Sequence, residues 1–148
     1  MNFVIGFRRA TQADIEFLID LRIASMNDHL IQAGIFMNRK QHNIRINEFF
    51  SDSHIILKDS EAIGLLKLGV LSNSLHIRQF QISPKFHSLG IGSKVLEVVK
   101  KKAKELKLPI TLNVLLANPA KQLYLRHGFV VEQENDLDYQ MRWRQKSS

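Results

Sequence analysis

The stretch "FHSLGIGSKVL", residues 86–96, places two glycines one residue apart where an irregular segment gives way to a helical pattern. The chain has only 7 glycines, so two of them this close together at the start of a helix indicate a structural or binding role. The first N–H groups of a helix lack partners inside the helix, and the helix dipole adds positive potential there. The loop is therefore either an anion site or a helix entry where glycine only relieves crowding.

Two common phosphate-binding motifs can be tested at this loop, and neither fits. A Walker A loop requires lysine directly after its second glycine, but Ser93 follows Gly92. A dinucleotide fingerprint requires a third glycine where Val95 stands. The loop alone leaves both interpretations open.

Working outward from the loop, the alternation of strand and helix patterns predicts a mixed α/β layer structure. The expected order is β-α-α-β-β-β-α-β-α-β-β. Strands are expected at 3–10, 54–59, 62–71, 75–82, 110–116, 129–134 and 137–144. Helices are expected after Thr11, within 38–51, at about 90–107 and at 118–127. Asp14 suits a capping box with Thr11, and Asn118 and Gly128 suit the two ends of the last helix.

Length and composition indicate one globular domain. A chain of 148 residues fits a single domain, which we expect to span 1–148. No run reaches the roughly 18 consecutive apolar residues of a membrane span, so we expect no membrane partner. The opening "MNFVIGFRR" has its apolar run before its charges, the reverse of a secretory signal. We therefore expect a cytoplasmic protein.

The metal-ligating residue types give no site. The absence of cysteine excludes disulfides, thiolate metal sites and a cysteine nucleophile. The histidines at 29, 42, 54 and 127 show no metal-binding spacing, so we interpret them as structural or surface residues and expect no metal.

A formal charge of +7 favours anionic partners: nucleic acid, anionic lipid or a phosphorylated small molecule. The segment "VVKKKAKELK", residues 98–107, is basic, but its lysines occupy the back of an amphipathic helix, where Glu97 and Lys101 form a favourable pair. We interpret it as a solvated face, and nucleic acid is disfavoured as a partner.

Two segments in order, "QISPKFHSLGIGS" at 81–93 and "NPAKQLYLRHGF" at 118–129, resemble the GNAT superfamily of acyl-CoA-dependent N-acetyltransferases. The signature loop of that family, Gln/Arg-x-x-Gly-x-Gly/Ala, is matched by His87, Ser88, Leu89, Gly90, Ile91 and Gly92, with histidine in place of the first residue. The second signature is matched by Asn118, Leu123, Tyr124, Gly128 and Phe129, with the Asn-to-Tyr spacing one residue shorter than in many members. The resemblance covers nearly the whole chain and implies a mixed, mostly antiparallel central sheet flanked by helices.

The resemblance also implies a coenzyme A site. The amides of Ser88 to Ser93 would cradle the pyrophosphate, and the strand residues Phe80, Gln81 and Ile82 would pair through their main chain with the pantetheine arm. On this interpretation acetyl-CoA is the co-substrate, and Asn118 and Tyr124 belong to the same site.

Two catalytic residues are candidates. The resemblance places the hydroxyl of Tyr124 near the coenzyme A sulfur, where a phenol can protonate the departing thiolate; otherwise the tyrosine only packs its helix against the sheet. His76 falls where some family members carry a glutamate base, and an imidazole suits that chemistry, although a histidine just after a turn is also typical of a surface. We expect His76, Arg78, Phe80 and Ile82 on one strand face, with Gln79 and Gln81 on the other.

The sequence favours an N-acetyltransferase that moves an acetyl group from acetyl-CoA to a primary amine of a small molecule or protein, by direct transfer in a ternary complex. The alternatives are a coenzyme A-binding or regulatory module without turnover, and a basic nucleic-acid-binding module. The acceptor is expected to meet residues 26–43, whose polar members include Asn27, Asp28, His29 and Asn38 but few acids, which disfavours a polyamine. We also expect the final strand to lie exposed, where it could pair across a homodimer.

Overall fold

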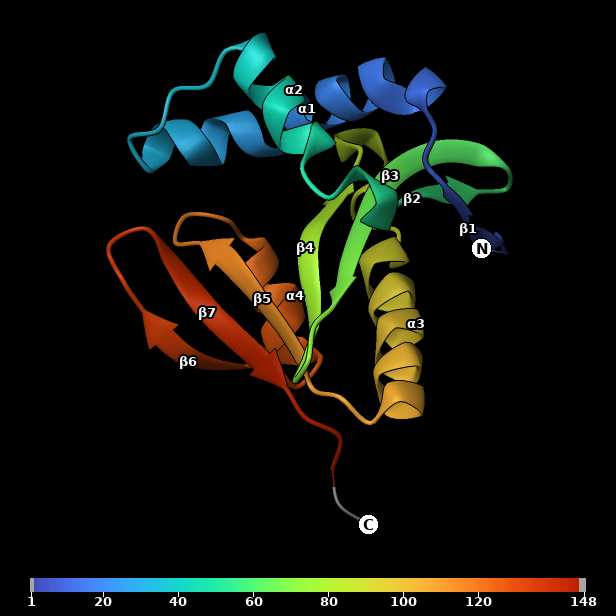
Figure 1. Cartoon of the computed structure of the whole chain (residues 1–148), viewed down its shortest axis with the longest axis vertical. Coiled ribbons are helices and arrows are strands. Elements are labelled where there is room, and N and C mark those ends of the chain that lie inside the picture. The colour runs from blue at the N-terminus through green and yellow to red at the C-terminus, as the bar shows by residue number, and fades with distance from the viewer. Residues whose placement is uncertain (1, 147–148) are drawn as a thin grey trace.

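The computed structural model describes residues 2–146 and has the predicted order of elements, which Figure 1 shows. The strands are β1 (Ile5–Arg9), β2 (Ser53–Lys58), β3 (Glu61–Val70), β4 (Leu75–Ile82), β5 (Ile110–Leu115), β6 (Val130–Glu134) and β7 (Asp138–Trp143). The helices are α1 (Ile15–Gln32), α2 (Arg39–Asn47), α3 (Ile91–Leu106) and α4 (Ala120–Arg126), with short 3-10 turns before α1, β2 and α3. The predicted fold class is confirmed.

The strands form one seven-stranded sheet in the order β1-β2-β3-β4-β5-β7-β6. Every neighbouring pair is antiparallel except β4 and β5, which are parallel. The parallel pairing covers only Leu75–Ile77 against Ile110–Leu112, and beyond it the two strands separate. Figure 1 shows this divergence, with β5, β6 and β7 turning away from β4. The sheet is therefore open in its middle.

Helices cover both faces of the sheet. On one face α3 and α4 pack through Val95, Leu96, Val99 and Tyr124 against Leu75, Ile77, Leu112 and Met141 of the strands. On the other face Leu18, Ile19 and Leu21 of α1 and Ile46 of α2 pack against Ile55 and Leu65. Among the residues that the structure describes, no helix is long and apolar enough to cross a membrane.

The predicted helix ends are confirmed in most details. Thr11 and Asp14 form the capping box that precedes α1, with the amide of Thr11 donating to Asp14 Oδ2 over 2.8 Å. Gly128 follows α4 with φ +88°, the left-handed conformation expected of a residue after a helix. Helix α4 begins one residue later than predicted, because its N-cap is Pro119 and not Asn118. The side-chain Oδ1 of Asn118 accepts a hydrogen bond from the amide of Ala120 over 2.9 Å.

Two predictions about the strands are wrong. The final strand β7 lies inside the sheet between β5 and β6, so the exposed edge belongs to β6, whose five residues are all exposed. A β-bulge in β4 leaves Arg78 without a partner, because Lys67 pairs with Gln79 and Leu68 with Ile77. The extra residue shifts the alternation of side chains by one. His76 therefore lies on the face of Gln79 and Gln81, opposite to Phe80 and Ile82.

Candidate active site

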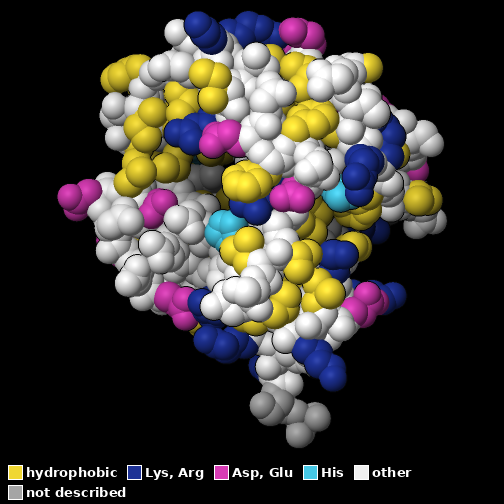
Figure 2. All heavy atoms as spheres, in the orientation of Figure 1, with side chains coloured by type: hydrophobic (Ala, Val, Ile, Leu, Met, Phe, Trp, Pro, Cys, Tyr) yellow, Lys and Arg dark blue, Asp and Glu magenta, His cyan; other side chains and the backbone are white. Residues whose placement is uncertain are grey.

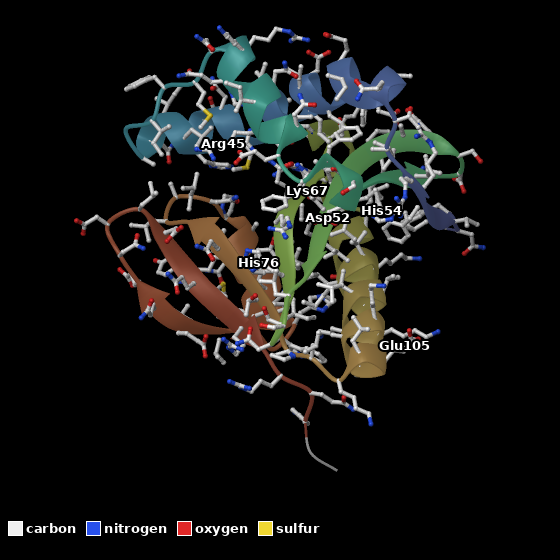
Figure 3. All side chains as sticks on the ribbon, in the orientation of Figure 1. Arg45, Asp52, His54, Lys67, His76 and Glu105 are labelled. Carbon is white, nitrogen blue, oxygen red and sulfur yellow. The ribbon has the colours of Figure 1, made fainter. Side chains whose placement is uncertain are left out.

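A first cavity of about 420 Å³ lies where β4 and β5 separate. Its walls come from α1, the end of α2, and the facing edges of β4 and β5, and it reaches Tyr124 of α4. Figure 2 shows a hollow on this face of the molecule, beneath α1 and α2, with Lys or Arg and acidic side chains at its upper rim. A histidine lies at its lower edge, where Figure 3 labels His76. We call this cavity the acceptor cavity.

A second cavity of about 410 Å³ lies against the glycine loop and the start of α4, and we call it the loop cavity. Within the described residues, no backbone or side-chain acceptor is in hydrogen-bond range of the six amides from Ser88 to Ser93. Ser88 and Gly90 both have left-handed backbone, with φ +65° and +79°. Left-handed residues alternating with extended or helical ones turn successive N–H groups toward one point. The loop therefore offers the free donors that a pyrophosphate requires.

Contacts with neighbouring elements hold this loop in place. The imidazole Nε2 of His87 lies 2.8 Å from the carbonyl oxygen of Ile82 at the end of β4. The imidazole Nε2 of His127 lies 2.9 Å from the hydroxyl of Ser93. A Cβ on Gly92 would lie 2.9 Å from Leu123 Cδ2, so this glycine allows α3 to approach α4. The free amides thus belong to a loop that is built before any ligand binds.

The two cavities meet at five residues common to both walls: Met26, Phe80, Gln81, Asn118 and Tyr124. Of the residues predicted for the cofactor site, all line the loop cavity except Leu89, which packs instead against the α3 core. His76 lines the acceptor cavity. The structure therefore places the two predicted catalytic residues on adjoining cavities, with His76 on the wall of one and Tyr124 on the walls of both.

Tyr124 is buried, with 6% of its surface exposed, and its ring packs 5.5 Å from that of Phe129. Among residues 2–146, the hydroxyl has no hydrogen-bond partner, and the residue lines both cavities. Burial raises the pKa of Tyr124 above its ordinary value of 10.0. The phenol therefore stays protonated over the physiological range, as a proton donor must.

His76 is held by a short chain of hydrogen bonds. Its Nδ1 lies 2.8 Å from Thr111 Oγ1, and the Thr111 hydroxyl donates to Ser74 Oγ over 3.1 Å. Because that donation uses the only hydroxyl hydrogen of Thr111, a neutral His76 carries its proton on Nδ1 and has its lone pair on Nε2. Burial, and secondarily Arg78, lowers the pKa of His76 below 6.5. His76 is therefore neutral at pH 7 and able to accept a proton.

Sequence reasoning missed the basic side chains of the acceptor cavity, which are Arg22, Arg45, Lys67 and Arg78. Lys67 is only 2% exposed, and its ammonium donates to the carbonyls of Arg45, Ile46 and Glu48 at the end of α2. Burial, followed by the charge of Arg22, lowers its pKa to about 8. Two signals were present in the sequence: Lys67 interrupts the apolar strand "AIGLLKLGV", and Arg22 stands on the apolar stripe of α1.

The segment expected to bind the acceptor contributes different residues from those predicted. Met26, Leu30, Ile35 and Met37 line the acceptor cavity, whereas Asn27, Asp28 and Asn38 line neither cavity. His29 lines the loop cavity. In the part of the chain that the structure describes, no group of three potential metal ligands lies together.

Some lysines of α3 contact side chains of neighbouring elements. Glu97 pairs with Lys100 at 3.4 Å and not with Lys101 as predicted. Lys100 also lies over the ring of Trp143, and Lys94 lies over that of Phe3. The interpretation as a solvated face therefore holds for Lys101, Lys102 and Lys104, which are exposed, and not for Lys100, whose side chain is only 13% exposed.

Comparison with known structures finds the same fold. The PaiA N-acetyltransferase from Thermoplasma acidophilum, solved with coenzyme A, is 21% identical with a TM-score of 0.75, over 96% of this chain and 99% of that one. Ard1 from Thermoplasma volcanium is 17% identical with a TM-score of 0.69, over 95% and 96%. N-acetylglutamate synthase from Neisseria gonorrhoeae, solved with coenzyme A and N-acetyl-glutamate, is 16% identical with a TM-score of 0.68, over 95% of this chain and 35% of that one.

No curated protein matches the sequence. A family model, that of the acetyltransferase (GNAT) domain, matches residues 30–143, which is most of the chain and includes both signature segments. This chain therefore belongs to the GNAT acetyltransferases, and it is an acyltransferase.

Proposed function

We propose that this protein is an N-acetyltransferase that moves an acetyl group from acetyl-CoA to a primary amine, by direct transfer while both substrates are bound. The observation that carries the proposal is the meeting of two cavities at Tyr124, one with free loop amides and one with a neutral histidine. Two substrates bound at once need such a junction, since the amine must reach the thioester. The coenzyme A complexes of similar folds support the choice of donor.

The residues of the loop cavity fit coenzyme A. Six amides without acceptors suit a pyrophosphate, and Arg126 adds a positive charge to the same wall. Beyond Ile77, the edge of β4 that faces β5 has no strand partner among residues 2–146, so Phe80 and Gln81 are available to pair with an extended amide chain. The Ile82 carbonyl is engaged by His87, so the proposal assigns the main-chain pairing to the residues before it.

The proposed chemistry divides between two side chains. A neutral amine attacks with its lone pair and loses one proton as the N–C bond forms, and His76 Nε2 is the base that accepts this proton, directly or through water. As the N–C bond forms, the C–S bond of the thioester breaks, and the Tyr124 hydroxyl protonates the departing thiolate. The acetyl group thus passes from sulfur to nitrogen, one proton passes from nitrogen to His76, and one proton passes from Tyr124 to sulfur.

Thermal unfolding with saturating acetyl-CoA, with ATP as the anionic control, tests the donor. Ligand at 100 times its Kd raises the unfolding free energy by about 2.7 kcal/mol, a Tm shift of roughly 5–11 °C at this size. We expect the shift with acetyl-CoA and not with ATP. Equal or absent shifts would contradict the proposal and leave the loop as a helix entry or an unselective anion site.

The acid role is tested by Tyr124→Phe, with Tyr139→Phe as the matched control, since these are the 2 tyrosines of the chain. Because the protein has no cysteine, thiol release reports coenzyme A alone. Loss of the general acid should lower kcat about 10²–10⁴-fold with the Kd for acetyl-CoA nearly unchanged. Undiminished turnover in Tyr124→Phe would remove Tyr124 from the mechanism.

A further inference from the structure

The wall of the acceptor cavity carries more basic than acidic side chains. Four basic side chains line it, Arg22, Arg45, Lys67 and Arg78, against two acidic ones, Glu48 and Asp138. Figure 3 shows Arg45 and Lys67 on the side of the cavity nearest α2, above His76. The acids are already engaged: Glu48 pairs with Arg45 at 3.1 Å, and Asp138 accepts from Asn113 and Asn135.

Arg22 is the arginine of the cavity that lacks a counter-ion among the described residues. It is only 7% exposed, and among residues 2–146 no carboxylate lies within ion-pair distance of it. Its one hydrogen bond is from Nε to Nδ1 of His42, over 3.1 Å. The two terminal amino groups of its guanidinium are therefore free, and the residue lines the cavity. Arg22, Met26 and Leu30 are spaced by four residues on α1, which turns all three toward this space.

The other three basic groups each have a partner for their charge, whereas Arg22 is the arginine of the cavity without a carboxylate partner in the described part of the chain. All the hydrogen bonds of Lys67 go to carbonyls of α2 and its end. Arg78 donates to Asp52 over 3.0 Å and stacks 3.6 Å from the ring of Phe49. Phe49, which also lines the cavity, has a left-handed backbone with φ +51°. Lys67 and Arg78 add positive potential to the cavity, and Arg22 is the guanidinium whose charge no described carboxylate balances.

A free guanidinium fork matches a carboxylate, because its two parallel N–H groups meet the two oxygens. Burying a cation without a partner is unfavourable, and an anion of single charge relieves it. At the junction of the two cavities, the side-chain oxygen of Gln81 is buried without a hydrogen-bond partner. It offers an acceptor for an N–H group near Tyr124.

We propose that the acceptor is a small molecule that carries a carboxylate as well as its amine, that Arg22 binds the carboxylate, and that Gln81 receives the amine end. The inference rests on the proposed function, since it names the class of acceptor for that same reaction. The cavity volume of about 420 Å³ suits a metabolite-sized compound of this class.

Matched amine pairs that differ only in the carboxylate test the proposal: L-phenylalanine with 2-phenylethylamine, L-methionine with 3-(methylthio)propylamine, and L-lysine with 1,5-diaminopentane. Thiol release with acetyl-CoA gives kcat/KM for each compound, and thermal unfolding with coenzyme A gives binding without turnover. We expect at least one carboxylated member to exceed its partner at least tenfold in kcat/KM or to raise Tm where its partner does not.

The preference should depend on Arg22. Arg22→Gln should reduce it about 10- to 100-fold, the range for one charge-assisted pair of hydrogen bonds. Arg22→Lys, which keeps the charge and helps to preserve folding, should reduce it less. The control is Arg39→Gln on α2, because Arg39 pairs with Glu16 and Asp20 on the surface and does not line the cavity. It should keep the wild-type preference.

The outcomes separate this inference from the proposed function. If the plain amines are acetylated as well as or better than their carboxylated partners in every pair, the inference is overturned and the N-acetyltransferase stands. If no compound is acetylated but carboxylated members raise Tm through Arg22, the carboxylate site at Arg22 stands, and the proposed function fails for these amines. If no carboxylated member is preferred in either assay, or if Arg39→Gln removes the preference as strongly as Arg22→Gln, the inference is overturned.

Discussion

Replacing Gly90 with alanine tests the loop in isolation from side-chain packing. Gly90 has φ +79°, and no atom lies within 4 Å of the Cβ that alanine would add. The substitution therefore brings no clash, only the strain of a left-handed L-residue, about 1–2 kcal/mol. Gly34, after α1, supplies a matched control, because its φ is +78° and its Cβ position is equally open.

In Gly34→Ala, the strain should appear only in folding, as a lower free energy of unfolding by about 1–2 kcal/mol. In Gly90→Ala, the loop can relax by turning its amides away, and binding of coenzyme A must then restore the left-handed conformation. The same strain converts to an increase in Kd of about 5- to 30-fold. Urea unfolding and isothermal titration with coenzyme A measure the two quantities. Wild-type affinity in Gly90→Ala, with a loss of stability equal to that of Gly34→Ala, would refute the assignment of the loop amides to the phosphates.

Two further predictions concern titration. His76→Gln should lower kcat/KM about 100-fold and remove the acid limb of the pH profile; in the wild type that limb should lie below pH 6.5, because burial and Arg78 lower the pKa of His76. His54→Gln, outside both cavities, is the control, and an unchanged limb in His76→Gln would exclude the base role. The Arg8 guanidinium lowers the pKa of Asp14 from 3.8 to about 2. Since the folded-state pKa is depressed, the Asp14 contribution to stability is full above about pH 5 and disappears as the pH falls through 4 toward 2. The difference in unfolding free energy between wild type and Asp14→Asn should shrink over that window, and a difference that stays constant from pH 6 to pH 2 would contradict this.

Much of the fold could be predicted because it depends on patterns within short stretches of sequence. The order of elements, the capping box at Thr11 and Gly128 after α4 all depend on a few neighbouring residues, and all are confirmed. Free amides at the start of α3 are also a local property, but their assignment to coenzyme A came from the family resemblance and stays a prediction.

What the sequence did not predict depends on pairing between distant segments. The bulge at Arg78 arises from the register of β4 on β3, and it moved His76 to the opposite face from the one expected by simple alternation. The place of β7 inside the sheet depends on its pairing with both β5 and β6. The basic cluster joins Arg22 of α1 to Lys67 of β3, which are 45 positions apart, and no local pattern brings them together.

The short ladder between β4 and β5 also has a mechanical meaning. Strands β1 to β4 form one half of the sheet and β5 to β7 the other, and within the sheet only Leu75–Ile77 paired with Ile110–Leu112 joins them. A compound that fills the opening between β4 and β5 contacts both halves at once, so its binding would resist movement of one half relative to the other. The shortest ladder of the sheet thus lies beside the acceptor cavity, and a compound bound there would bridge the gap that the backbone hydrogen bonds leave between the two halves.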